Sequence, residues 1–461
     1  MSKPFTMAEA IKEARRCLNC ANPVCRSGCP IENNIPQFIR SLKEGNLGTA
    51  YEALSERSNL PAICGRVCPH EKQCEAACVL AKNKHGIQIS KLEMFVADFA
   101  YENSLKPLPP TTGARGQVAI IGSGPAGLTV AGDLAKLNFG VTVFEGQSEP
   151  GGVLLFGIPQ FRLDKEVVRR EIEQLRQIGV NFKCNILIGS KLTVDDIFAQ
   201  GYDAVFMGTG TSLPRTLDIP GKELAGIVTA AYYLQMVFLV DNDKLDSRET
   251  LLHEGDNVLV IGAGNVAMDA ARTAIRRGAR DVTVIFHKGE DDISAFPSEY
   301  RAALKEGVRF SFMKQPIAYL NKKQMRALKN IRQHPDADDE TALAGILVQN
   351  MVKDKEGKLQ PSNGQEYIPC DSVILAIGQK PAARIVSTTT GIKVDRKGYV
   401  ITRDIPYGMT TRPGVFSSGA VVNGPATVVL AMRESKKVAA GIAQYIDAKR
   451  LLAECEKPVQ E

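Results

Sequence analysis

Two short segments near the start of the chain hold eight of its eleven cysteines. The first, CLNCANPVCRSGCP, spans residues 17–30, and the second, CGRVCPHEKQCEAAC, spans residues 64–78. Both contain the C-x3-C-P ending of ferredoxin-type motifs, at residues 25–30 and 64–69, and residues 17–20 add a C-x2-C pair. Such spacings bring several thiolates to one cluster, so the two segments predict two [4Fe-4S] clusters.

Two other interpretations of these cysteines stay open. Structural zinc usually takes two separated C-x2-C pairs, and the second segment contains no C-x2-C. The thiols could also be buried without any ligand. Between the two segments, residues 35–57 carry apolar side chains at helical spacing. We therefore expect both cysteine loops to extend from a small helical domain.

A dinucleotide-binding unit is predicted over residues 117–146. An apolar strand leads into Gly122-x-Gly124-x-x-Gly127, and a helix and a second strand ending in Glu145 follow. Glycines at this spacing let the backbone approach a pyrophosphate at the start of the helix, and the acid can bind both ribose hydroxyls. The position between strand and helix makes this motif far more specific than an isolated GxGxxG.

A second unit of the same kind contains Gly262, Gly264 and Ala267, and its second strand ends in His287 and Lys288. An acid at that strand end favours NAD, whereas basic residues suit the 2′-phosphate of NADP. The sequence therefore favours NADPH over NADH. Three arginines on the adjoining helix are rival partners for that phosphate: Arg272, Arg276 and Arg277.

Composition and charge exclude several classes of protein. The chain has 461 residues, 44% of them hydrophobic, and a net charge of +6 without a long basic tract, so no nucleic-acid partner is expected. No signal sequence and no apolar run long enough for a membrane span are recognisable; residues 230–240 are predicted to form a buried helix instead. We expect a cytoplasmic protein, whose cysteines serve metal or redox chemistry.

The order of these motifs predicts an α/β protein in which a helical iron–sulfur domain precedes two nested Rossmann-like domains. The first dinucleotide unit is interrupted by the second and then resumed, as in two-domain flavoproteins that hold FAD and a nicotinamide cofactor. Nicotinamide gives up a hydride, flavin converts it to single electrons, and clusters carry these. Such chemistry requires apposed rings, so no catalytic acid, base or triad is expected. The predicted segments are 1–104 (clusters), 105–116 (linker), 117–240 and 371–461 (FAD), and 241–370 (NADPH).

The chain resembles the small (beta) subunit of NADPH-dependent glutamate synthase over nearly its whole length. It is similar also to the NADPH-binding subunit of ferredoxin-dependent transhydrogenase and to the electron-entry half of dihydropyrimidine dehydrogenase. The motifs that carry the resemblance are CGRVCP, GSGPAGL, GGVLLFGIPQFRL, AVFMGTG, GAGNVAMDAARTA and GPATVV. With the resumed C-terminal segment, these motifs imply further cofactor-binding residues: Pro125, Ala126, Gly152, Ile158, Pro159, Arg162, Gly210, Asn265, Val266, Gly378, Gly419, Ala420, Thr427 and Val428.

The resemblance also implies how the cluster ligands divide between two sets. Cys17, Cys20, Cys25 and Cys78 form the first set; Cys29, Cys68, Cys74 and Glu93 form the second. In relatives, the last ligand of the second set is a carboxylate or amide on the following helix, which is Glu93 here. Spacing alone favours Cys64 in that place, so an eight-thiolate scheme remains the alternative.

Two positions depart from the family pattern. Relatives carry Asp in the GVFAxGD segment, where it binds the ribityl chain of the flavin, whereas this chain has GVFSSGA with Ala420. Loss of a hydrogen bond to a charged group costs about 1.5–3 kcal/mol, so we expect weakened or retuned FAD binding. At the end of the second unit, His287 stands where relatives tend to have Arg.

Three functions fit these motifs. In the first, the chain is an electron-transfer subunit that exchanges hydride between NADPH and FAD and exchanges single electrons with a partner subunit that contains flavin or iron–sulfur clusters. That complex would be glutamate synthase-like or a ferredoxin-linked transhydrogenase, with or without electron bifurcation. In the second, the chain is a stand-alone flavin oxidoreductase, although the GGVLLFGIPQF segment lacks a redox-active C-x-x-C. In the third, it is a scaffold with a degenerate flavin site.

Overall fold

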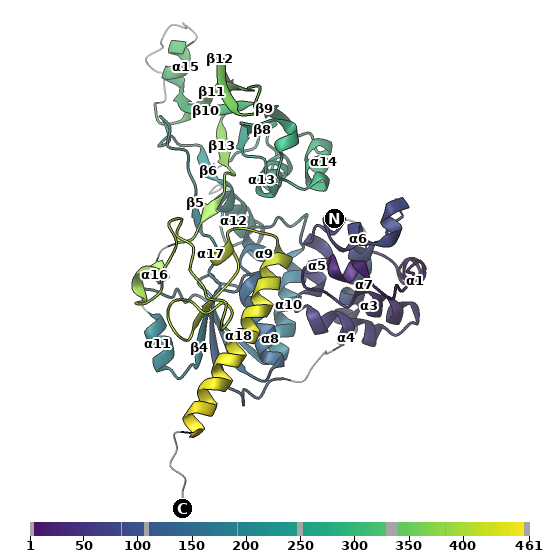
Figure 1. The fold of residues 1–461 in the computed structure, drawn as a ribbon. Coiled ribbons are helices and arrows are strands. Elements are labelled where there is room, and N and C mark those ends of the chain that lie inside the picture. Colours follow the sequence, from purple (N-terminus) through teal and green to yellow (C-terminus); the bar gives the residue numbers. More distant parts are fainter. Residues whose placement is uncertain are drawn as a thin grey trace, which may run out of the picture. The chain divides into compact units, whose positions relative to one another are not determined.

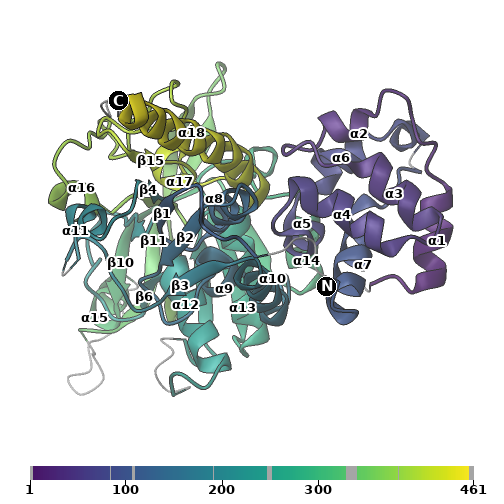
Figure 2. The same ribbon diagram turned by 90° about the horizontal axis from the view of Figure 1, so that it is seen from below.

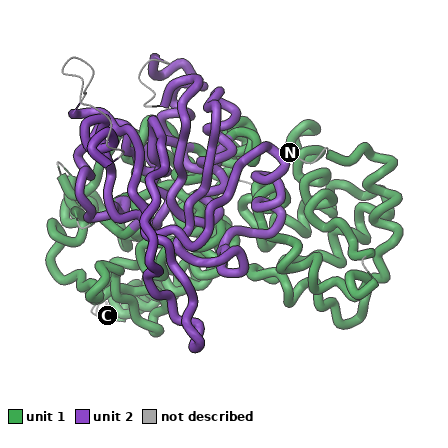
Figure 3. Tube along the Cα trace, turned by 90° about the horizontal axis from the view of Figure 1, so that it is seen from above, with its two compact units in different colours: residues 1–155, 160–213, 380–461 green, residues 156–159, 214–379 purple. Residues whose placement is uncertain are grey.

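A computed structural model describes residues 4–83, 85–105, 110–190, 192–246, 252–328, 340–382 and 384–455. The chain divides into two compact units, which Figure 3 colours separately. The first unit comprises residues 1–155, 160–213 and 380–461, and the second comprises residues 156–159 and 214–379. Part of the predicted linker, residues 106–109, lies outside the described residues.

The N-terminal part of the first unit is helical, as predicted. Thr6 and Glu9 form a capping box at the start of α1, and the apolar face of α3 buries Phe38, Ile39 and Leu42 in the centre of this part. The long helices pack around that core, and the cysteine segments form the short helices and loops between them (Figure 1). The elements are α1 (Met7–Arg15), α2 (Val24–Ser27), α3 (Ile35–Lys43), α4 (Leu47–Arg57), α5 (Pro61–Val67), η1 (His70–Lys72), α6 (Cys74–Ala77), η2 (Val79–Asn83) and α7 (Ile89–Glu102).

The rest of the first unit is built on a parallel five-stranded sheet in the order β15-β4-β1-β2-β3. Nearly every residue of β1 and β4 is buried, as expected of parallel strands covered on both faces. Strand β15 comes from the C-terminal segment, so the chain completes this sheet only after forming the second unit. The strands are β1 (Gln117–Ile121), β2 (Gly140–Phe144), β3 (Val180–Lys183), β4 (Ala204–Met207) and β15 (Val415–Ser417).

Helices flank this sheet, and α18, the long C-terminal helix of Figure 1, packs against α8. None of the helices among the described residues combines the length and apolar character that a membrane span requires. The helices are α8 (Pro125–Lys136), α9 (Val153–Phe156), α10 (Lys165–Gln177), α11 (Val194–Ala199), α16 (Arg384–Thr388), α17 (Ala420–Asn423) and α18 (Val428–Cys455).

The second unit contains another parallel sheet, in the order β6-β13-β7-β8-β9. The strands of this sheet are β6 (Ile227–Thr229), β7 (Asn257–Ile261), β8 (Asp281–Phe286), β9 (Arg309–Phe312) and β13 (Ser372–Leu375). The helices of the second unit are α12 (Ala230–Asp241), α13 (Asn265–Arg276), η4 (Glu290–Asp292), α14 (Pro297–Lys305) and α15 (Lys322–Leu328). The helix predicted over 230–240 is therefore present as α12, and it packs against α13 in this unit.

An antiparallel sheet in the order β10-β11-β12 also belongs to the second unit. Its strands are β10 (Lys314–Asn321), β11 (Leu343–Lys353) and β12 (Leu359–Pro369). A short two-stranded ribbon of β5 (Leu213–Pro214) and β14 (Gln379–Lys380) forms where the chain passes from one unit to the other. In each parallel sheet one strand, β1 or β7, leads into a glycine turn and a helix, so the two sheets are the nested pair of Rossmann-like domains that the motifs predicted.

Candidate functional site

The first set of thiols lies on loops at one end of the helical domain. Cys17 follows α1, Cys20 lies in the next loop, Cys25 lies in α2, and Cys78 ends α6. Burial raises the pKa of Cys17, and the neighbouring thiols of Cys20 and Cys78 raise it further. Burial likewise raises the pKa of Cys25 to about 11, with contributions from Cys17 and Cys78. The neighbours of Cys17 therefore include Cys20, Cys25 and Cys78, which means that the fold brings these four residues together.

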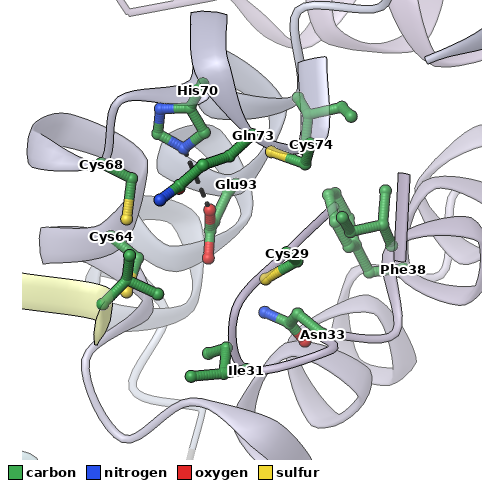
Figure 4. Close-up of a pocket in the computed structure, with 13 residues that line it drawn as sticks. Cys29, Ile31, Asn33, Phe38, Cys64, Cys68, His70, Gln73, Cys74 and Glu93 are labelled. Carbon is green, nitrogen blue, oxygen red and sulfur yellow. Dashed lines mark ion pairs between the residues drawn. The ribbon is translucent and has the colours of Figure 1, made fainter. Parts of the chain in front are cut away.

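The second set lines a separate, small cavity. Cys29, Cys68, Cys74 and Glu93 line it, and Cys64 lies in the same wall as Cys68 (Figure 4). Cys29 and Cys74 face these two cysteines across the cavity, and the carboxylate of Glu93 lies between them. Burial raises the pKa of Cys29 to about 11, and Glu93 and Cys64 raise it further. The structure therefore brings Cys29, Cys68, Cys74 and Glu93 together with Cys64 around one cavity, and which of them are cluster ligands stays a prediction.

Both candidates for the last ligand reach this cavity. Glu93 on α7 is 6% exposed, and burial raises its pKa. Its Oε2 atom lies 3.7 Å from Nε2 of His70. The sulfur of Cys64 lies 3.7 Å from Oγ of Ser58 and 3.6 Å from Sδ of Met432. Cys64 therefore also contacts two residues that do not line the cavity. His70 was missed from the sequence, although a histidine between two cysteines in CPHEKQC was the available signal.

The donors present fit a cluster of several irons. Among the described residues, no three Cys, His, Asp or Glu side chains converge on a site for a single ion. The second set of thiols lines a cavity together with one carboxylate, and several thiolates delivered from short spacings are the usual ligands of iron–sulfur clusters. Beyond the effect of burial, repulsion from neighbouring thiolates raises the pKa values of Cys25, Cys29 and Cys74. The carboxylate of Glu93 repels the thiolates of Cys29 and Cys74 in the same way. That repulsion is relieved when iron binds the thiolates, because a metal ion favours the deprotonated form.

The second cavity lies against the flavin-binding part of the first unit. Val429 of α18 forms part of its wall, and Met432, one turn later, contacts Cys64. Asn59, just before α5, donates to the carbonyl oxygen of Thr129 at 3.0 Å and to Asp133 of α8 at 2.8 Å. Gly132 makes this approach possible, because a Cβ atom there would lie 2.5 Å from the Asn59 side chain.

A buried carboxyl group and two ion pairs join the same two parts at a second place. Glu171 of α10 accepts a hydrogen bond from the backbone nitrogen of Ala62 at 2.6 Å and so caps the start of α5, the helix that carries Cys64. Asp98 of α7 accepts from Arg66 and from Arg170, each at 2.7 Å. These side chains are at most one-fifth exposed, so the ion pairs are shielded from solvent.

The first glycine turn has the geometry that a pyrophosphate needs. Gly122 has a φ of +94°, and a Cβ atom at Gly127 would lie 2.0 Å from the Gly122 carbonyl oxygen. A Cβ atom at Gly124, in contrast, would meet only open space, so the backbone is accessible there. Glu145 accepts from the backbone nitrogen of Ser123 at 2.9 Å, which holds its carboxylate beside the turn. The roles of these residues at the phosphates and ribose of a dinucleotide stay a prediction.

Other predicted flavin contacts surround this turn. A Cβ atom at Gly152 would lie 2.9 Å from the Cα of Gly124, and one at Gly419 would lie 2.9 Å from the Cβ of Ala126. Half-buried Ala420 begins α17 directly after Gly419. The remaining positions are spread over the chain: Pro125 starts α8, Gly210 follows β4, Arg162 lies before α10, Thr427 and Val428 start α18, and Ile158, Pro159 and Gly378 belong to the second unit.

The second glycine turn repeats the first in its own unit. Gly262 has a φ of +125°, and a Cβ atom there would lie 2.4 Å from the carbonyl oxygen of Ala376. Asn265 accepts from the backbone nitrogen of Phe296 at 2.8 Å and so holds the loop beyond the turn. A Cβ atom at Gly264 would come no closer than 3.5 Å to its nearest neighbour, which leaves room for a ligand. In the helix that follows, Ala267 is fully buried and Val266 is half exposed.

The basic residues near this turn differ in availability. Lys288 is exposed and His287 half-buried at the end of β8, where burial lowers the pKa of His287. The three rival arginines of α13 instead make ion pairs: Arg272 with Glu299 and Glu306, Arg276 with Glu306, and Arg277 with Asp241. Lys288 and His287 are therefore better placed than these arginines to select a 2′-phosphate.

Comparisons with known proteins agree with this geometry. Residues 1–105 match the family described as dihydropyrimidine dehydrogenase domain II, 4Fe-4S cluster, and residues 116–435 match the pyridine nucleotide-disulphide oxidoreductase family. The glutamate synthase [NADPH] small chain of Halomonas elongata is 34% identical over 454 residues, covering 96% of this chain and 92% of the relative. The NAD-dependent dihydropyrimidine dehydrogenase subunit PreT of Salmonella typhimurium is 32% identical over 443 residues, covering 96% of each chain.

A solved structure supports the fold of the two dinucleotide domains. FprA from Mycobacterium tuberculosis, in complex with NADPH, matches with a TM-score of 0.58 and 18% sequence identity. The match covers 74% of this chain and 87% of that protein. At this identity the likeness concerns architecture, and it agrees with the two parallel sheets and their glycine turns.

Proposed function

We propose, from the premise that this chain belongs to the pyridine nucleotide-disulphide oxidoreductase family and carries a dihydropyrimidine dehydrogenase-type 4Fe-4S domain, that it is the electron-entry subunit of a larger complex. It is an NADPH- and FAD-dependent oxidoreductase, similar throughout its length to glutamate synthase small chains. The proposal concerns its place in a complex, the number of its clusters and the residues that hold them.

The observation that carries the proposal is the position of the second cavity. Its wall includes Val429, which follows the predicted flavin contacts Thr427 and Val428. Cys64 of the helical part also contacts Met432 of the flavin-binding part. When bound, nicotinamide and flavin exchange a hydride and iron–sulfur clusters carry single electrons. A cluster site built into the edge of the flavin-binding part supports direct exchange between the two within one chain.

Each group would be held by residues of known position. We assign one [4Fe-4S] cluster to the set of Cys17, Cys20, Cys25 and Cys78 and the other to Cys29, Cys68, Cys74 and Glu93. Gly124 and the start of α8 would receive the FAD pyrophosphate, and Glu145 its ribose. Lys288 and His287 would bind the 2′-phosphate of NADPH.

A partner chain completes the proposal. The relatives are described as a small chain and as a subunit, which supports a hetero-oligomer here. The partner would contain flavin or iron–sulfur centres of its own and supply the final acceptor or donor. Glutamate synthase-like and ferredoxin-linked transhydrogenase complexes both fit this description.

Anaerobic reconstitution tests the cofactor content. We expect roughly eight irons per chain, matching acid-labile sulfide, and signals of two [4Fe-4S] clusters by electron paramagnetic resonance after NADPH addition. Stoichiometric zinc without iron, or clusters that stay oxidised while NADPH bleaches the flavin, would contradict the proposal. Purification from native extract tests the partner: rapid turnover of NADPH with a small-molecule substrate by the single chain would instead establish a stand-alone oxidoreductase.

A further inference from the structure

Three large apolar side chains are exposed beside the first set of thiols. Leu18 follows Cys17 and is 62% exposed, Val24 precedes Cys25 and is 43% exposed, and Val79 follows Cys78 and is 40% exposed. Single exposed apolar residues are common on proteins, but apolar residues grouped at one redox site are not explained by folding. We call Leu18, Val24 and Val79 the apolar rim.

The rim residues lie close together because the segments that carry them pack on one another. Helices α2 and α6 lie side by side in Figure 2, and Gly28 at the end of α2 approaches Ala77 so closely that a Cβ atom there would lie 2.7 Å from the Ala77 Cβ. Helix α3 packs on α2 as well, and its Arg40 donates to Asn19, the residue that follows Leu18. One partner surface can therefore touch all three rim residues at once.

Basic side chains lie beside the rim. Residues 12–44 contain six basic and three acidic side chains. Two of the acids are paired with arginines, Glu13 with Arg16 at 2.6 Å and Glu32 with Arg57 at 3.6 Å, and the third, Glu44, is exposed. The exposed basic residues next to the rim are Arg26 on α2 and Arg40 and Lys43 on α3, and Arg40 donates to Asn19 at 2.9 Å.

We propose that the apolar rim, with Arg26, Arg40 and Lys43 around it, is the docking surface for an acidic electron-carrier protein. An apolar centre excludes water from the contact, and a ring of charge speeds association and selects partners of opposite sign. Electron exchange between proteins weakens steeply with distance, so a carrier gains most by docking directly over the first thiol set. The inference rests on the proposed function, since it assumes that this set holds a cluster.

Binding of a defined probe tests the proposal without turnover. The oxidised, reconstituted holoprotein is immobilised, and the dissociation constant of an acidic plant-type [2Fe-2S] ferredoxin is measured by biolayer interferometry, with basic cytochrome c as the opposite probe. We expect ferredoxin to bind and its affinity to fall at least about 10-fold between about 0.01 M and 1 M ionic strength, as the Debye length shrinks from roughly 30 Å to 3 Å. Cytochrome c should not bind in a salt-dependent way.

Variants separate charge from apolar contact. Arg26→Glu and Lys43→Glu should each weaken ferredoxin binding about 3- to 10-fold at low salt and little at high salt. Arg396→Glu, at an exposed position in the C-terminal segment, makes the same change of net charge and should have no effect. Leu18→Gln and Val79→Gln should weaken binding at every salt concentration, with iron content unchanged.

Several outcomes would overturn the docking surface. They are an equal response of Arg26→Glu and Arg396→Glu, ferredoxin binding that is insensitive to salt, or self-association of the chain that Leu18→Gln abolishes. Iron analysis and paramagnetic resonance of the same samples keep the two claims apart. If the clusters assemble and NADPH reduces them while ferredoxin does not bind, the docking inference fails and the proposed function stands.

Discussion

Glu171 offers a sharp test of how the cluster-bearing and flavin-binding parts are joined. Its side chain is 2% exposed and accepts from the backbone nitrogen of Ala62 at 2.6 Å. Burial raises its pKa to about 8, although the Ala62 hydrogen bond and the charges of Arg170 and Arg66 act in the opposite direction. The carboxyl group is therefore neutral in the folded protein at pH 6 to 7, where an exposed glutamate is charged.

The sign of the pH dependence follows from this difference. In the unfolded chain Glu171 releases its proton near its ordinary value of 4.5, whereas the folded protein keeps the proton until about 8. The stabilisation is fully present below pH 4.5 and is lost as the pH rises to about 8. Each pKa unit corresponds to 1.36 kcal/mol, so the contribution of this group to the free energy of unfolding changes by about 5 kcal/mol across that window.

Glu171→Gln removes the titration and keeps the acceptor for Ala62. Wild type and variant should have similar thermal stability near pH 5, and the variant should be the more stable protein near pH 8.5. Difference infrared spectroscopy should show a protonated carboxyl band that titrates near pH 8 in the wild type and is missing from the variant. Glu173→Gln, on the same helix but half exposed, should change neither result. A stability difference between wild type and Glu171→Gln that does not vary with pH would refute the reasoning.

Three further predictions concern the cofactors. Cys64→Ser should leave both clusters assembled if Glu93 is the last ligand, and conversion of one cluster to a three-iron form in the paramagnetic resonance spectrum would identify Cys64 as the ligand instead. Ala420→Asp should tighten FAD binding by about 10- to 150-fold, from a charge-assisted hydrogen bond of about 1.5–3 kcal/mol, as measured by titrating apoprotein with FAD; an unchanged dissociation constant would mean that the position does not reach the flavin. Lys288→Glu should lower the ratio of flavin reduction rates with NADPH and NADH in stopped-flow experiments, and an unaltered ratio would mean that this lysine points away from the nucleotide.

The glycine turns could be predicted from the sequence because their requirements are local. Gly122 and Gly262 have positive φ angles and approach carbonyl oxygens of neighbouring strands, and no other residue type meets both conditions without strain. The spacing of the cysteines is local as well, since loops of a few residues limit where the thiols can lie. Helical periodicity between residues 35 and 57 predicted α3 and α4 for the same reason.

Long-range contacts could not be predicted in this way. The Cys64–Met432 contact joins residues 368 positions apart, and no periodicity or spacing relates them. His70 becomes a neighbour of Glu93 only when α7 packs beside the second cysteine segment. Arg272 looked like a phosphate ligand in the sequence, but its ion pairs with Glu299 and Glu306 depend on the packing of α14 and the loop after it against α13.

The close approach of Asn59 to Gly132 bears on how such proteins can be assembled by gene fusion. Any side chain at position 132 would displace the Asn59 amide, and Asp133 would then lose a buried partner. An iron–sulfur cassette grafted from another protein would therefore need a compatible residue at position 59, and a flavin cassette would need glycine at 132. Joining two cassettes at the linker alone would leave this contact unmatched, so we expect such a fusion to be more stable when positions 59 and 132 are exchanged together.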